Sequence, residues 1–155
     1  MRRPFLTSPD ARHSLYANFK GRLQMEYLIG LALSLAVAGS AAVLGFGRER
    51  AFYPTLLIVI AAYYVLFAVM GGSARALGLE IAAASAFSLM AVLGFKRNLW
   101  LVAGAIVGHG VFDLVHHWFI ENPGVPLWWP GFCSAFDVVF GAAFPAQLMR
   151  RHARS

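Results

Sequence analysis

The chain contains five apolar runs, each about as long as the hydrocarbon thickness of a lipid bilayer. They cover residues 25–46, 51–70, 74–95, 98–120 and 128–149. A helix of about 20 apolar residues crosses a bilayer, and backbone groups in hydrocarbon must find their hydrogen bonds within the same segment. The runs therefore predict an all-α integral membrane protein, a compact bundle of about five transmembrane helices.

The charge pattern agrees with this membrane interpretation. Only 13% of the residues are charged, whereas soluble domains carry roughly 25%. The formal net charge is +6, and the basic residues lie mainly at the chain ends and between the apolar runs, where anionic lipid headgroups attract them. We therefore expect a multi-pass protein of the cell membrane whose main partner is the lipid bilayer, with no binding of nucleic acid.

The breaks between the runs define the domain organisation. They predict a basic amino-terminal arm over residues 1–22, a five-span transmembrane domain over 23–149 and a basic tail over 150–155. Prolines in the arm favour irregular structure, or a segment that lies along the membrane surface. Residues 36–38 resemble a signal-peptide cleavage site, but the apolar run continues to spanning length, so we expect the first span to be retained.

Residues 121–131 form the most distinctive break. Their sequence, ENPGVPLWWPG, contains three prolines and two adjacent tryptophans. Proline prevents the helix from continuing, and tryptophan favours the membrane–water interface. The segment therefore predicts a surface loop, either a rigid interfacial cap or a lid over a pocket.

Small residues recur every fourth position in three of the runs. Such stripes let helix backbones approach closely, and they serve equally well for packing within one bundle or for a homo-oligomer. The stripes consist of Gly30, Ser34, Ala38 and Ala42, then Gly78, Ala82 and Ala86, and finally Gly104 and Gly108.

The fourth run carries a row of ionisable residues that lipid should reject. His109, Asp113, His116 and His117 project within roughly a third of the helix circumference, at about 100° per residue. An ionised carboxylate facing lipid at mid-depth costs at least about 2.5 kcal/mol. We therefore expect this face to point into the bundle.

Two further acids should lie at a similar depth. Spans alternate in direction, so the start of the third run, the end of the fourth and the start of the fifth share one side of the membrane. Glu80 and Asp137 therefore fall in the same half of the bilayer as Asp113. We predict a polar pocket, with the fourth helix as one wall and these two acids on the opposing walls, because mutual hydrogen bonding offsets the cost of burial.

The residue types in this pocket suit two kinds of chemistry. Histidine nitrogens and carboxylate oxygens bind divalent transition metals such as zinc, iron, manganese or copper. Without a metal, the same groups can pass protons to and from a substrate. The predicted catalytic residues are His109, Asp113, Glu80 and Asp137; the predicted metal ligands are His109, Asp113, His116 and His117; and the predicted substrate-binding residues are Trp118, Trp128, Trp129 and Phe136.

These features predict an intramembrane enzyme that acts on a lipophilic small molecule. A second interpretation is a transporter of protons or metal ions, because chains of acids and histidines in membranes serve as relays. A third is a non-catalytic assembly subunit, in which the polar cluster only fixes the register of the helices. The sequence alone leaves all three open.

Overall fold

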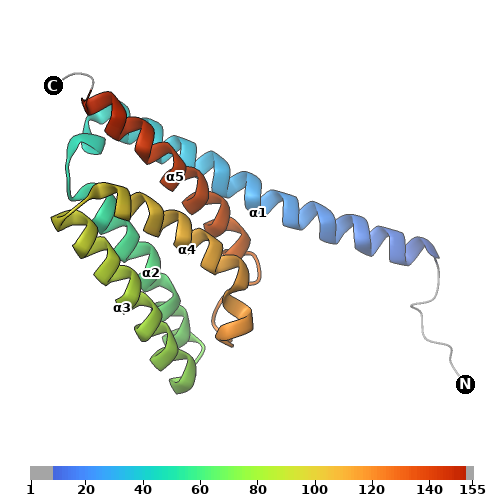
Figure 1. The fold of residues 1–155 in the computed structure, drawn as a ribbon. Coiled ribbons are helices and arrows are strands. Elements are labelled where there is room, and N and C mark those ends of the chain that lie inside the picture. The colour runs from blue at the N-terminus through green and yellow to red at the C-terminus, as the bar shows by residue number, and fades with distance from the viewer. Residues whose placement is uncertain (1–8, 153–155) are drawn as a thin grey trace, which may run out of the picture.

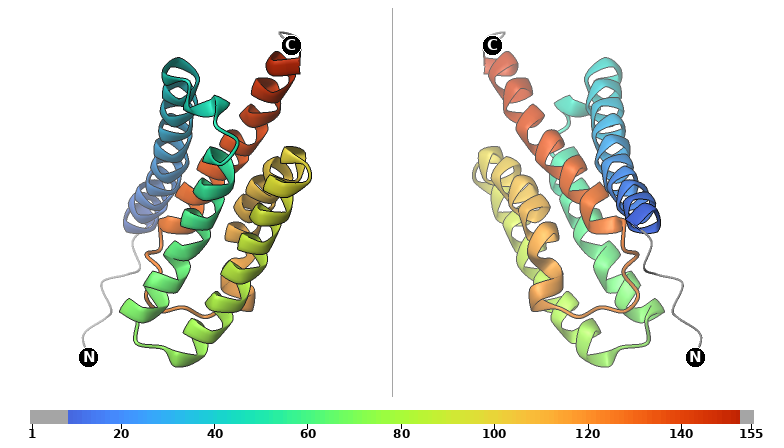
Figure 2. Two further views of the ribbon diagram at one scale, coloured as in Figure 1. Left: turned by 90° about the vertical axis from the view of Figure 1, so that its left-hand side faces the viewer. Right: turned by 90° about the vertical axis from the view of Figure 1, so that its right-hand side faces the viewer.

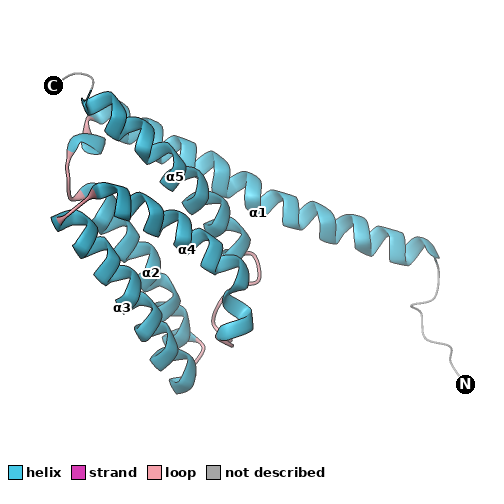
Figure 3. Cartoon of the chain, viewed as in Figure 1, coloured by secondary structure: helices cyan, strands magenta, loops and turns pink. Residues whose placement is uncertain are grey.

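The fold is a bundle of five helices, as the apolar runs predict (Figures 1 and 3). The computed structural model describes the backbone of residues 9–152 and the side-chain environment of residues 21, 24–145 and 149. Every regular element in this described part is helical (Figure 3). The elements are α1 (Pro9–Leu44), a short 3-10 turn η1 (Phe46–Arg48), α2 (Phe52–Met70), α3 (Ala74–Lys96), α4 (Leu99–Phe119) and α5 (Trp129–His152).

Helix α1 is longer than the first apolar run. It spans 36 residues from Pro9 and ends before Gly45, whose φ of 82° only glycine adopts readily. Its amino-terminal part extends well beyond the other helices (Figure 1). From Pro9 onward, the predicted irregular arm is thus helical, because proline is tolerated in the first turn of a helix. The remainder of the arm, residues 1–8, lies outside the described residues.

Local capping residues set the breaks that the sequence predicts. Ser73 begins α3 by accepting a hydrogen bond from the amide of Ala76 at 3.2 Å, and Asn98 begins α4 by accepting one from the amide of Trp100 at 2.9 Å. Such side-chain acceptors satisfy amides that have no partner in the first helical turn. Two sharp turns therefore separate α2 from α3 and α3 from α4.

The helices pack in the pairs α1 with α5, α5 with α4, α4 with α3 and α3 with α2. Aromatic side chains of α2 also contact α5, and Figure 2 shows the bundle from two sides. Helix α5 packs between α1 and α4, while α2 packs mainly on α3 and touches α4. On α1, Gly30 lies against the carbonyl of Phe132, so this member of the first small-residue stripe serves the contact with α5. A Cβ added at Gly78, Gly104 or Gly108 would meet nothing within 4 Å.

Four helices are long and apolar enough to cross a membrane, within the residues that the structure describes. These segments are Gln24–Leu44, Phe52–Met70, Ala74–Lys96 and Leu99–Phe119. Helix α5, the fifth expected span, is not among them. Side chains 146–148 and those from 150 onward lie outside the described residues, so only part of α5 enters this comparison. The described part lies between α1 and α4 and buries Ser134 and Asp137.

Candidate functional site

Three ionisable side chains meet at the contact between α4 and α5. His109 and Asp113 lie one turn apart on α4, and Asp137 faces them from α5. The Nδ1 atom of His109 is 2.7 Å from Oδ2 of Asp137 and 3.5 Å from Oδ2 of Asp113. All three side chains are buried, with at most 2% of their surface exposed. We call these residues the inner triad.

A glycine makes this close approach feasible. A Cβ at Gly110 would lie 2.9 Å from the Cβ of Asp137 and 3.1 Å from the carbonyl oxygen of Ser134. A larger residue would therefore push α5 away from the face of α4 that carries His109. The sequence of α4 thus supplies both the polar groups and the space for the third one.

The inner triad contains buried oxygen atoms that make no hydrogen bond within the described part of the chain and could contact a ligand. Among the described residues, both carboxylate oxygens of Asp113 and the Oδ1 atom of Asp137 are buried without a hydrogen-bond partner. Buried polar atoms are normally paired, so such atoms call for a physical explanation. One ligand atom from each residue lies within 4.8 Å of the others, an arrangement that could hold a metal ion.

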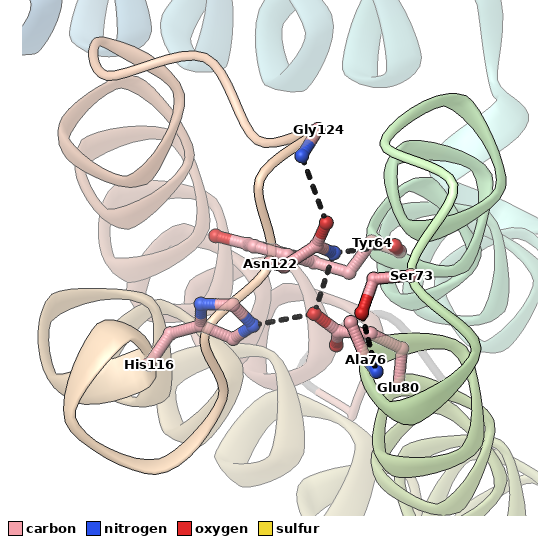
Figure 4. A network of polar contacts seen from close by, with 7 residues as sticks. All are labelled: Tyr64, Ser73, Ala76, Glu80, His116, Asn122 and Gly124. Atoms are coloured by element: carbon pink, nitrogen blue, oxygen red, sulfur yellow. Dashed lines mark hydrogen bonds and ion pairs between the residues drawn. The ribbon is translucent and has the colours of Figure 1, made fainter.

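A second cluster lies further along the same face of α4 (Figure 4). The Nε2 atom of His116 is 2.7 Å from Oε1 of Glu80 on α3. The side-chain amide of Asn122 donates to the same Glu80 oxygen at 2.8 Å and to the carbonyl of Tyr64 at 3.1 Å. Its own oxygen accepts from the amide of Gly124 at 3.1 Å. We call His116, Glu80 and Asn122 the outer cluster.

Tyr64 lies between the two groups. Its ring centroid is 4.3 Å from that of His116 and 6.2 Å from that of His109. Its hydroxyl is buried, makes no short hydrogen bond among the described residues, and lies close enough to Asp113 to interact with its carboxylate. Phe87 and Phe112 cover the two histidines with further ring contacts. The inner triad is therefore enclosed by aromatic surface on this side.

An apolar cleft reaches the inner triad from the opposite side. It lies between α1, α2 and α5 and has a volume of about 670 Å³. Helices α1 and α2 are not closely packed against each other there. Asp137 forms part of its wall, so this residue belongs both to the cleft and to the triad. Of the predicted substrate-binding residues, Trp128, Trp129 and Phe136 line the cleft.

The structure divides the other predicted site residues between two places. Glu80 and His116 are buried in the outer cluster rather than beside His109. His117 and Trp118 are exposed and line a separate surface hollow of about 430 Å³. Successive helical residues differ in direction by about 100°, so His117 turns outward although its neighbour faces the interior.

Three residues of these sites were not among the predicted site residues. Asn122 follows the end of α4 directly before a proline, a context that indicates only a turn. Tyr64 is one of several aromatic residues in α2, where such side chains commonly serve packing alone. Glu26, which also lines the cleft, lies near the start of an apolar run, where acids commonly face headgroups. Their roles depend on contacts distant in the sequence, which no local pattern reveals.

Comparison of the chain with protein-family models, with curated proteins and with solved structures finds no match. The chemistry of the site must therefore be inferred from its own groups. One imidazole nitrogen and two carboxylates in a dry interior can coordinate a divalent transition metal or exchange protons with a bound molecule.

Proposed function

We propose that this protein is a multi-pass membrane enzyme that binds a divalent transition metal at the inner triad and acts on a lipophilic substrate. The outer surface supports the membrane location. Large apolar side chains are exposed along α1, α2 and α3, among them Leu28, Leu66 and Leu89. Soluble monomers rarely expose contiguous apolar patches of this kind, whereas lipid solvates them at no cost.

The observation that carries the metal assignment is the set of buried carboxylate oxygens that make no hydrogen bond among the described residues. Two acids that face the same imidazole within a dry interior repel each other when both are ionised. A divalent cation would compensate their charge and use the three oxygens that lack hydrogen bonds. Such an ion, when bound, would supply Lewis-acid chemistry or activate a water molecule.

The cleft supports the choice of a lipophilic substrate. Its walls are almost entirely apolar, and its one fully buried acid, Asp137, belongs to the inner triad. Its volume lies in the range of about 300–1,000 Å³ that is common for small-molecule sites. A molecule dissolved in the bilayer could therefore reach the triad without crossing water.

Metal analysis of the purified full-length chain in maltoside detergent tests the metal assignment. We expect about one metal ion per chain in the wild type and in His117→Ala, and loss of the ion in His109→Ala. The two variants are matched, because both remove a histidine from α4 but only His109 belongs to the triad. Equal metal content in the two variants, or no stoichiometric metal in any sample, would contradict a metal site at the inner triad.

Lipid analysis tests the enzymatic part. Membranes from cells that express the wild type, Asp137→Asn or His117→Ala would be compared by untargeted mass spectrometry. We expect at least one lipophilic compound to change in the wild type and in His117→Ala, but not in Asp137→Asn. A profile unaffected by any of the three proteins would contradict an enzyme and favour the assembly-subunit interpretation.

A proton or metal-ion transporter is the second candidate, and one observation favours it. Ionisable and hydroxyl groups follow one another from Glu80 and His116, past Tyr64, to the inner triad. Such a row resembles the relays of membrane pumps. Proteoliposomes would show an ion flux that the double substitution Asp113→Asn and Asp137→Asn abolishes; a flux that survives both changes would exclude this relay.

A further inference from the structure

The cleft beside the inner triad has two chemically different ends. Along its inner part, Ile29, Leu33 and Val37 follow one another at intervals of one turn on α1 and face Leu56 and Ile60 of α2. At its other, outer end lie Met25 and Trp128. Met25, Ile29, Leu33 and Trp128 are all about half exposed. The cleft is therefore an apolar groove that the surroundings can reach along its length.

Aromatic rings gather at this outer end. Trp129 lies 5.2 Å from Tyr63, 5.4 Å from Trp128 and 5.6 Å from Phe132, measured between ring centroids. All four rings line the cleft. They come from α2, from Trp128 just before α5 and from the start of α5, so the tertiary fold assembles them.

An acid lies at the boundary of the cleft. A Cβ at Gly131 would lie 2.7 Å from Oε2 of Glu26. Gly131 lines a neighbouring surface hollow of about 430 Å³, and Glu26 forms part of the wall of both this hollow and the cleft. Among the described residues that line the cleft, the charged ones are Glu26 and Asp137, and none is basic. Aromatic faces combined with carboxylates attract organic cations, and quaternary ammonium groups are bound by aromatic cages in this way.

We propose that the cleft binds a lipophilic ammonium compound, with its cationic head between Glu26 and the four rings and its apolar chain along α1 and α2. At about 30 Å³ for a water-sized group, the volume of about 670 Å³ holds roughly twenty such groups. That space is sufficient for one chain and its head group. The inference rests on the proposed function, because it names the class of substrate that the inner triad would meet at Asp137.

Photolabelling of the full-length protein in maltoside micelles tests this inference. The probes are three hexadecyl compounds, each with a diazirine in the chain, that differ only in the head: trimethylammonium, sulfate or hydroxyl. We expect the ammonium probe to label residues 25–37 of α1 at least about fivefold more than the other two, given the strength of cation–aromatic and ion-pair contacts. An excess of unlabelled hexadecyltrimethylammonium should suppress this labelling, whereas hexadecanol should not.

Matched variants show whether the acid is responsible. Glu26→Gln should remove the preference for the ammonium head, whereas Glu121→Gln should preserve it, because Glu121 is exposed and does not line the cleft. Leu33→Trp should fill the cleft and reduce labelling by all three probes. Equal labelling by the three heads in the wild type, or equal effects of the two glutamate variants, would overturn the proposal.

Metal analysis of the same samples separates the two proposals. If the wild type retains its metal but shows no preference among the probes, the substrate class is wrong and the metal site stands. If the ammonium preference is present without metal, the cleft proposal stands and the metal assignment fails.

Discussion

The inner triad and the outer cluster contain the same kind of contact but differ in how completely it is satisfied. Each pairs a buried histidine of α4 with a carboxylate from another helix at 2.7 Å. In the outer cluster, Asn122 adds a donor to Glu80 and ties the surface loop to α2. In the inner triad, three carboxylate oxygens have no hydrogen-bond partner among the described residues.

This difference separates a structural role from a ligand-binding role. A polar network whose members all have partners fixes the positions of its helices and has little to offer a further molecule. A buried group without partners destabilises the fold until something binds to it. We therefore expect substitutions in the outer cluster to change stability, and substitutions in the inner triad to change binding.

The largest expected effect is the loss of Glu80. Glu80→Ala leaves His116 and Asn122 without their shared acceptor in a buried position, and breaking such a pair costs about 3–5 kcal/mol. The free energy of unfolding in detergent should fall by roughly this amount, while metal bound per folded chain should stay unchanged. Glu121→Ala, which removes an exposed acid of the adjacent loop, is the control. Loss of metal with unchanged stability would assign the ligand role to the outer cluster instead.

A glycine substitution tests the spacing on which the inner triad depends. Gly110→Ala would force α4 and α5 apart where Asp137 approaches, at a cost of about 1–3 kcal/mol, and should weaken metal binding as well. Gly108→Ala, on the same helix with nothing within 4 Å of the added Cβ, should leave binding intact and stabilise the helix by up to about 1 kcal/mol. Similar results for both variants would show that the contact between α4 and α5 does not position the triad.

A substitution of Asp113 should separate an effect on metal binding from an effect on stability most directly. Asp113→Asn removes a buried charge whose oxygens make no hydrogen bonds among the described residues and whose ion-pair contact with His109 is long, at 3.5 Å. Metal affinity should fall at least about tenfold, while the thermal stability of the metal-free protein should be equal or higher. Calorimetric titration and thermal unfolding of the same preparation measure both quantities. A loss of stability comparable to that of Glu80→Ala would instead make the triad a structural network.

The smallest expected effect concerns the loop. Asn122→Ala removes hydrogen bonds to Glu80, to the Tyr64 carbonyl and from the Gly124 amide, but leaves the His116–Glu80 pair in place. A loss of about 1 kcal/mol is expected, with faster hydrogen exchange at Gly124. Unchanged exchange would show that the prolines alone hold the loop.

Much of the fold follows from the sequence because its signals are local. The length of each apolar run, the glycines near residue 71 and the capping Asn98 define helices and breaks without reference to distant residues. The same holds for the row on α4, whose spacing places His109, Asp113 and His116 on one face. His117 shows the limit of such an argument. Spacing gives the direction of a side chain to within tens of degrees, but it does not show whether that direction faces the protein interior or the outer surface.

The sequence by itself determined that this chain forms apolar helices and that ionisable groups gather on one face of the fourth. Only the tertiary structure decided which acid meets which histidine: Asp137 joins His109, and Glu80 joins His116. It also decided that α1 and α2 leave an apolar cleft open beside Asp137. The physical reason is that helix formation depends on neighbours along the chain, whereas pairing and cavities depend on how helices distant in sequence pack against one another.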